Sequence, residues 1–141
     1  MKGDPENKQC KSGNSFIRKI NKYVNKLDDN EKKIADRIEA ATDLLEIDQL
    51  PVFYSNKANH MLCKLYTDNK QYAEAKKACD YVIAHRSSLD ESIDVVDAYC
   101  NIASGLLAED KFEEARRVIQ DAMKDHERNE KVSDGEDIEC S

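Results

Sequence analysis

Two stretches of the chain, forty residues apart, have the same order of apolar and small side chains. The first copy contains Leu62, Cys63, Tyr66, Tyr72, Ala75, Cys79 and Val82, and the second contains Ile102, Ala103, Leu106, Phe112, Ala115, Ile119 and Ala122. Each copy has the spacing of a helical stripe, a polar turn and a second helical stripe. Repeated helix pairs stack on one another because a single pair cannot bury its apolar face alone. The pattern predicts an all-α fold and argues against catalysis.

The composition is that of a helical chain with solvated outer faces. The 141 residues include no Trp, four Gly and two Pro, and 22 Lys and Arg stand against 29 Asp and Glu, for a formal net charge of -7. An acidic chain repels the phosphate backbone, so nucleic-acid binding is not expected. No apolar run approaches the roughly 20 residues of a membrane span. Residues 1–6 are polar and do not form a secretory signal, so the chain is expected to be cytosolic or a piece of a longer protein.

The periodicity predicts six helices, paired as three antiparallel hairpins at about 15–46, 52–86 and 88–126. These hairpins form one helical domain over residues 1–126, with a loose stretch at its start. Asp29 or Asn30 is expected to cap the second helix. The S-x-x-E sequence from Ser88 to Glu91 has the form of a capping box and predicts the start of the fifth helix. Residues 127–141 are acidic and are predicted to be a disordered tail.

Residues of catalytic or metal-binding type do not converge in this pattern. His60, His85 and His126 fall on different predicted helices, and none belongs to a metal-binding array. The five cysteines form no C-x-x-C motif, which argues against a zinc site. We therefore predict no enzymatic activity, no metal and no cofactor.

The spacing within the last two hairpins resembles the tetratricopeptide repeat. The residues that match are Tyr99, Ile102, Ala103, Leu106, Ala115, Ile119 and Ala122, with Asn59, Leu62, Cys63, Tyr66, Ala75, Cys79 and Val82 in the earlier copy. The small residues of this set, such as Ala103, Ala115 and Ala122, let two helices approach closely, while the large residues fill the gap to the next hairpin. The resemblance implies a stack of three hairpins that binds protein or peptide partners. The copies are forty residues apart rather than thirty-four, which places extra residues around positions 89–95.

A further resemblance depends on the order of motifs. The sequence D-P-E-N-K-x-C from Asp4 to Cys10, the basic helix from Phe16 to Lys22, and F-E-E-A from Phe112 resemble the endoplasmic-reticulum co-chaperones of DnaJ subfamily C that inhibit the interferon-induced protein kinase. This resemblance implies a lumenal stress-response protein that binds misfolded polypeptides and cooperates with BiP in the unfolded protein response. The His-Pro-Asp tripeptide of a J domain is absent, so stimulation of a chaperone ATPase is not expected of these residues.

Two cysteines of the first copy are symmetric about its predicted turn. Cys63 and Cys79 each lie eight residues from position 71, about 12 Å along antiparallel helices, so the two are expected at the same height. This geometry fits a disulfide and two buried thiols equally well. The family resemblance implies the disulfide, and it gives Cys10 a partner upstream of the sequence. Cys100 is expected to be a core or groove residue, and Cys140 is expected to be incidental.

The concave surface of such a stack is the expected binding site. The groove candidates are Lys57, His60, Lys64, Asp97, Cys100, Asn101 and Ser104. They are mixed in charge and mostly polar, which leaves two functions open. The chain either binds polypeptide clients in the lumen, or serves as a structural spacer or adaptor, lumenal or cytosolic, that binds no client itself. The sequence does not indicate an oligomeric state.

Overall fold

The computed structural model describes the backbone of residues 5–89 and 94–129 and the side chains of residues 15–89 and 94–126. Within these ranges the chain is all-α, and it contains no strand. The elements are α1 (Pro5–Asp28), α2 (Ile34–Leu45), α3 (Val52–Asp68), α4 (Tyr72–Ala84), the 3-10 helix η1 (Arg86–Ser88), α5 (Val95–Ala108) and α6 (Phe112–Asn129). The predicted acidic tail lies outside the described residues from position 130 onward.

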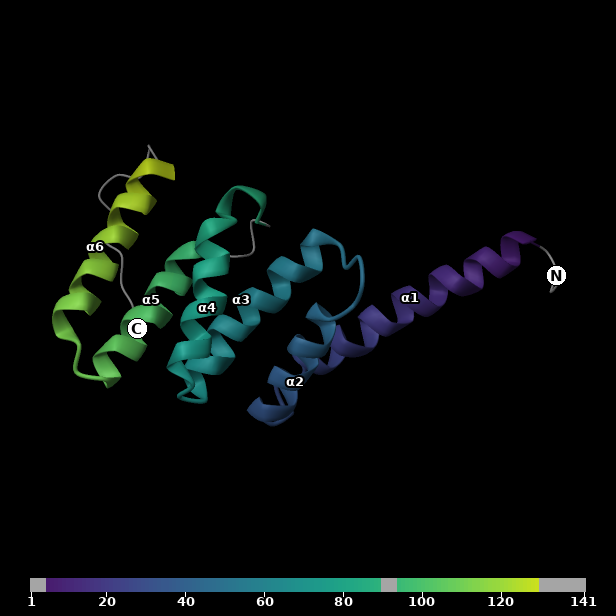
Figure 1. Cartoon of the computed structure of the whole chain (residues 1–141), viewed down its shortest axis with the longest axis horizontal. Helices are drawn as coiled ribbons and strands as arrows, with labels where there is room; N and C mark the ends of the chain where they lie inside the picture. Colours follow the sequence, from purple (N-terminus) through teal and green to yellow (C-terminus); the bar gives the residue numbers. More distant parts are fainter. Residues whose placement is uncertain (1–4, 90–93, 130–141) are drawn as a thin grey trace.

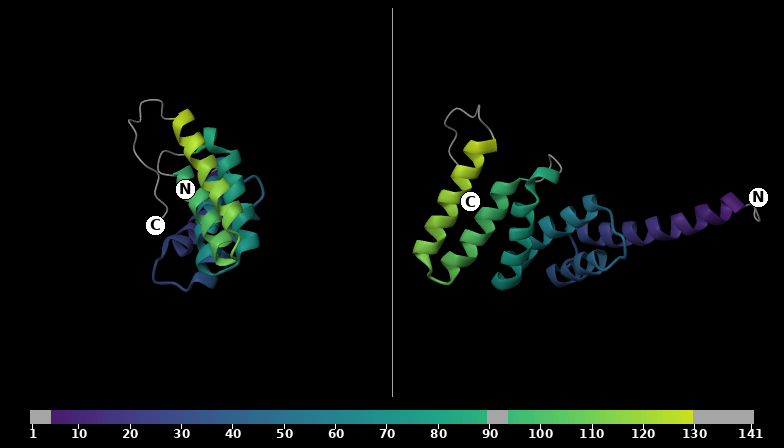
Figure 2. Two further views of the ribbon diagram at one scale, coloured as in Figure 1. Left: turned by 90° about the vertical axis from the view of Figure 1, so that its left-hand side faces the viewer. Right: turned by 45° about the horizontal axis from the view of Figure 1, so that its top comes forward.

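The helices follow one another in a row, from α1 at one end to α6 at the other (Figure 1). Each helix packs against the one before it, and α3 also contacts α5 across the row. The first half of α1 extends away from the other helices in Figure 1 and in the right-hand view of Figure 2. The core therefore begins in the second half of α1 and continues through α5.

Alanine and cysteine are prominent where the helices cross. Nine of the stripe positions are buried: Leu62, Cys63, Ala75, Cys79, Val82, Ile102, Ala103, Ala115 and Ala122. Small side chains at a crossing let helix axes approach, so that larger neighbours such as Leu44 and Val82 fill the remaining space without voids. The inward-facing stripe predicted from the sequence is confirmed at these positions.

The two copies end their first helix in the same way. Lys70 and Asp110, forty residues apart, both have left-handed backbone conformation, with φ of 65° and 63°. The amide of Gln71 donates to the carbonyl of Tyr66 at 2.8 Å, and that of Lys111 donates to Leu106 at 2.8 Å. These bonds form the Schellman motif, which satisfies the last carbonyls of a helix and reverses the chain. The tight turns lie where the sequence predicted them, although neither has the usual glycine.

Three predicted helix starts are wrong. The fifth helix begins at Val95, where the Asp94 Oδ1 accepts a hydrogen bond of 2.9 Å from the Val96 amide, so the extra residues of the forty-residue spacing precede it. Ser88 instead closes η1, its hydroxyl donating to the His85 carbonyl at 3.0 Å. Ser88 lies seven residues before Val95, too far along the chain to cap this helix.

The other two differences lie in the first helix pair. The second helix begins at Ile34 without a side-chain cap, because Asp29 accepts a bond of 3.0 Å from the Glu31 amide and stabilises the connecting turn instead. The first helix begins at Pro5 rather than near residue 15. Proline suits the first turn of a helix, where its missing N–H has no partner to lose.

Gly105 offers a direct test of how α4 and α5 pack. A Cβ atom added there would lie 2.9 Å from Cδ1 and 3.3 Å from Cβ of Tyr72. Alanine would improve helix propensity by about 1 kcal/mol, yet we expect Gly105→Ala to lower the free energy of unfolding by about 1–3 kcal/mol through overpacking. Chemical denaturation measures this. In a Tyr72→Ala background the same change should be stabilising, and a loss of equal size in both backgrounds would contradict the packing.

Candidate functional site

A groove between α3 and α5 brings together most of the residues predicted to bind a partner. A cavity of about 280 Å³ lies there, lined by His60, Cys63, Lys64, Asp97, Asn101 and Ser104 among others. These residues recur every three or four positions on each helix, so each set forms one face. We refer to this cavity as the α3–α5 groove. Its role in binding is not tested by the geometry and stays a prediction.

The groove candidates differ in their surroundings. Cys100 also lines the groove, whereas Lys57 does not: its Nζ pairs with the Asp28 Oδ1 at the end of α1, at 3.2 Å. Lys64 Nζ lies 3.8 Å from the Asp68 Oδ2, one turn along α3, with both groups well exposed. Exposed pairs of this kind contribute little to stability, so Lys64 can turn toward a ligand at small cost.

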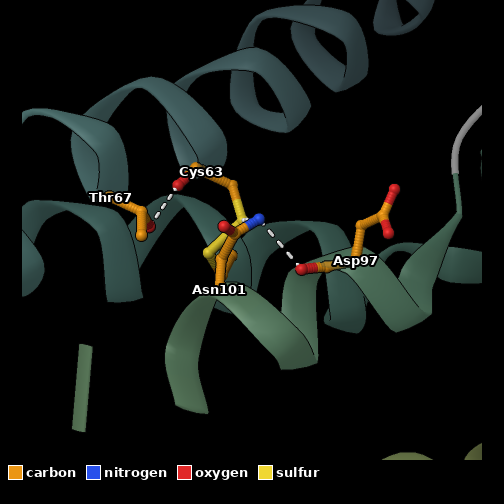
Figure 3. Close-up of a disulfide and its surroundings, with 5 residues drawn as sticks. Cys63, Thr67, Asp97 and Asn101 are labelled. Carbon is orange, nitrogen blue, oxygen red and sulfur yellow. Dashed lines mark hydrogen bonds between the residues drawn. A yellow bond between two sulfur atoms is a disulfide. The ribbon is translucent and has the colours of Figure 1, made fainter. Parts of the chain in front are cut away.

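One cysteine of the first copy, Cys63, lines the groove, and its partner Cys79 lies behind it on α4. The Sγ atoms of Cys63 and Cys79 lie 2.12 Å apart, at disulfide distance, and their Cα atoms are separated by 4.8 Å. Asn101 lies beside the sulfur atoms, and its Nδ2 donates to the Asp97 carbonyl at 2.9 Å and to the Cys63 Sγ at 3.6 Å (Figure 3). Both cysteines are almost fully buried, with exposed fractions of 2% and 0%. The sulfur pair joins α3 to α4, and Asn101 extends the contact to α5.

His60 is the groove residue whose electrostatics differ most from those in water. Burial lowers the pKa of its imidazole below the ordinary value, and this effect outweighs the nearby Asp97 carboxylate, which raises the same pKa. A neutral imidazole can both donate and accept a hydrogen bond. The groove therefore offers hydrogen-bond donors and acceptors, together with one ammonium group and carboxylates. This set suits binding of a polar ligand rather than nucleophilic catalysis.

Sequence reasoning missed a buried carboxylate that joins three elements. Asp125 on α6 is 6% exposed, and its Oδ2 accepts hydrogen bonds from the Tyr99 hydroxyl at 2.7 Å and from the Arg86 Nη1 at 3.1 Å. Burial first, and the bond to Asp125 second, raise the pKa of Tyr99 well above its ordinary value. One signal was present in the sequence, because Asp125 follows Ala122 by three residues on the inward stripe.

A second buried polar residue holds the connection that follows α4. Asn56 on α3 is 2% exposed, its Nδ2 donates to the Ser88 carbonyl at 3.1 Å, and its Oδ1 accepts from the Tyr81 hydroxyl at 3.2 Å. The Tyr81 ring stacks on His85, with centroids 3.9 Å apart. No local sequence pattern indicated Asn56, because its partners lie 25 and 32 residues away.

Neither a metal site nor a membrane span is found among the residues that the structure describes. Within residues 15–89 and 94–126, no group of three or more His, Cys, Asp or Glu side chains is placed to bind an ion. None of the helices in the described ranges is both long and apolar enough to cross a bilayer.

The lowered pKa of His60 predicts a pH dependence of stability. The unfolded chain takes up a proton near the ordinary value, about 6.5, while the folded chain resists protonation at His60. The free energy of unfolding should therefore fall as the pH drops from 6.5 toward the folded pKa, with no effect of His60 above that range. Urea melts at several pH values, with His60→Gln and the control His85→Gln, measure this. A slope that survives His60→Gln would contradict the prediction.

Removing the Asp125 carboxylate should destabilise the C-terminal helix pair. Asp125→Ala leaves two partly buried donors without their acceptor, and we expect a loss of about 2–3 kcal/mol, discounted because the Arg86 side chain is 32% exposed. Tyr99→Phe should cost about 1–2 kcal/mol. The matched control on the same helix is Asp121→Ala, an exposed position where we expect a change within about 0.5 kcal/mol. Equal losses of unfolding free energy in the two alanine variants would show that the hydrogen bonds of Asp125 do not stabilise the helix pair.

The comparisons with known proteins give one relative and no broader assignment. The chain matches no family model, and no solved structure gives a significant match. Among curated proteins it is similar to DnaJ homolog subfamily C member 3 of Gallus gallus, with 24% identity over 137 residues. The match covers 96% of this chain and 26% of the relative, so the chain spans about a quarter of that protein's length. This similarity supports a relationship with DnaJ subfamily C.

Proposed function

We propose that this chain is a protein-interaction module of a co-chaperone, built as a tetratricopeptide-like stack of three antiparallel hairpins. In this proposal the α3–α5 groove binds segments of misfolded polypeptide in the lumen of the endoplasmic reticulum. Cooperation with BiP, a part in the unfolded protein response and inhibition of a kinase would belong to the whole protein, of which this chain resembles a quarter. The observation that carries the proposal is the convergence of the predicted residues on one groove.

The groove has the chemistry that an extended polypeptide requires. A peptide backbone presents alternating N–H and C=O groups, and Ser104, Asn101 and His60 offer side chains that pair with either. Asp97 and Lys64 are exposed on opposite walls, so side chains of both charges find a counterpart. Such mixed surfaces suit many sequences rather than one, as binding of misfolded clients demands.

The cysteine pair supports the lumenal location. Disulfides persist in oxidising compartments and are rare in the cytosol, and Cys63 and Cys79 are held at bonding distance on facing helices. A bridge closing a loop of about 15 residues contributes about 3 kcal/mol in the chain-entropy model. We infer that the pair is oxidised in the mature protein and stiffens the groove at Cys63.

The runner-up is a spacer that orders neighbouring domains and binds no client. It is favoured by the mostly polar lining that the described residues give the groove, since holdases recognise apolar segments. It is also favoured by the buried ties through Asn56 and Asp125, which keep neighbouring helices at fixed angles.

A substitution that fills the α3–α5 groove distinguishes client binding from the spacer function. Ser104 is exposed on the groove wall, so Ser104→Tyr should fill the groove without disturbing the core, and we expect it to weaken binding of a reduced, carboxymethylated polypeptide at least about tenfold. Fluorescence anisotropy of the labelled polypeptide measures this, with Lys77→Tyr on the exposed face of α4 as the matched control.

Two outcomes would count against a client-binding groove. If the unmodified chain neither binds the polypeptide nor suppresses its aggregation at equal molarity, the spacer function is favoured. If Ser104→Tyr and Lys77→Tyr bind the polypeptide as tightly as the unmodified chain, clients bind elsewhere on the molecule.

A further inference from the structure

An apolar hollow lies between α5 and α6, beside the α3–α5 groove. Its volume of about 280 Å³ exceeds the roughly 150 Å³ of an engineered cavity that accommodates benzene, so a large side chain fits there. Its apolar lining consists of Ala103, Leu107, Phe112, Ala115 and Ile119. Leu107 and Phe112 are 49% and 62% exposed, which is high for large apolar side chains on packed helices. We call this surface the α5–α6 hollow.

The hollow and the groove share a border on α5. Cys100 and Ser104 line both of them. Ser104 is exposed and has a short side chain, so a bound segment can cross it from the groove into the hollow. The groove and the hollow therefore form one continuous surface, which is polar on the side of α3 and apolar on the side of α6.

The hollow supplies the apolar contact that the groove lacks. A misfolded polypeptide exposes large apolar side chains, and their removal from water is the main favourable contribution to association. The groove is lined mostly by polar side chains, whereas Leu107, Phe112 and Ile119 add apolar area next to it. Binding sites commonly combine an apolar lining with a few polar groups that fix the orientation of the ligand. The groove and the hollow have this composition together, and neither has it alone.

Charged side chains distinguish the two ends of the continuous surface. Asp94 and Asp97 are exposed at the start of α5, and none of the ion pairs between described residues includes either carboxylate. Arg116, which is also exposed, lines the hollow instead. Since opposite charges attract and like charges repel, a basic side chain of a bound segment is favoured near Asp97 and disfavoured in the hollow.

The length of α5 between the two ends limits the segments that fit. Leu107 follows Asp97 by ten residues, which is about 15 Å along the axis of α5. An extended chain advances about 3.3 Å per residue, so about five residues span this distance. A segment that contacts both ends therefore has its basic residue and its large apolar residue about five positions apart.

We propose that the client-binding surface extends from the α3–α5 groove across Ser104 into the α5–α6 hollow, and that it selects extended segments with a large apolar residue about five positions from a basic residue. The apolar side chain contacts Leu107 and Phe112, and the basic side chain pairs with Asp97. This inference rests on the proposed function and deepens it, because it states which client segments the groove binds.

Removing the apolar side chains of the hollow should weaken client binding. We expect the double variant Leu107→Gln with Phe112→Gln to bind the labelled, reduced and carboxymethylated polypeptide about tenfold more weakly, because the buried apolar contact is lost. Both side chains are exposed, so the variant should keep the circular dichroism spectrum and denaturation midpoint of the unmodified chain. Met123→Gln is the matched control, since Met123 is 45% exposed on α6 and does not line the hollow. It should change the dissociation constant by less than about twofold.

A synthetic peptide tests the selected segment directly. It has a lysine at its centre, a phenylalanine on each side at a spacing of about five residues, and Gly, Ser and Gln elsewhere, so that either chain direction places one phenylalanine in the hollow. Replacing both phenylalanines by serine, or the lysine by glutamate, should weaken binding about tenfold. The loss from serine should vanish in the Leu107→Gln and Phe112→Gln double variant, and the difference between lysine and glutamate should shrink in Asp97→Asn but not in the control Asp121→Asn.

The possible results separate this inference from the proposed function. If the unmodified chain binds neither the polypeptide nor the peptide, both are wrong. If Ser104→Tyr blocks binding while the double variant in the hollow binds as tightly as Met123→Gln, clients occupy the groove and not the hollow, and only the inference is overturned. It is also overturned if sedimentation shows that the unmodified chain is a dimer and that the double variant is a monomer, because the hollow then binds a second copy.

Discussion

The placement of α5 against the α3–α4 pair determines the candidate site. Three contacts set it: Gly105 lets Tyr72 approach the α5 backbone, Asn101 reaches the Cys63 sulfur at 3.6 Å, and Ala98 is buried within the core. Each contact needs a small or precisely shaped residue on α5, because close packing of helices leaves no room for a compensating shift. The α3–α5 groove exists because the two walls are held at this separation.

The opposite ends of the helix pairs are stabilised by different means. At the tight ends, the left-handed residues Lys70 and Asp110 close the chain with backbone hydrogen bonds alone. At the open ends the connection from α4 to α5 is long, and buried side chains take over: Asn56 binds Ser88, and Asp125 binds Arg86 and Tyr99. A longer connection has more conformational entropy to lose, so it requires ties from outside itself.

The sequence could predict what depends on local periodicity, and little beyond it. The buried stripe and the two tight turns repeat at an interval of forty residues, so each copy supports the prediction made from the other. Asn56 and Asp125 were not predictable, because a polar side chain is buried only when distant partners satisfy it. The capping box at Ser88 failed because Ser88 belongs to η1 and the next helix begins only at Val95, a placement that the local motif does not determine. The groove set was largely predictable from helical spacing, but the diversion of Lys57 to Asp28 depends on the packing of α1.

The differences between the two copies are more informative than their similarity. Where the first copy has Cys63 and Cys79, the second has Ala103 and Ile119, so the covalent link between the two helices of the first copy has no counterpart at these positions of the second. Tyr72 is covered by the next helix, whereas Phe112 is exposed at the end. A repeat unit in the interior of a stack is stabilised on both sides, but a terminal unit lacks one interface and needs another source of stability. In the second copy the buried Asp125 tie supplies part of that stability from within the pair, and it also holds the end of α6 beside α5.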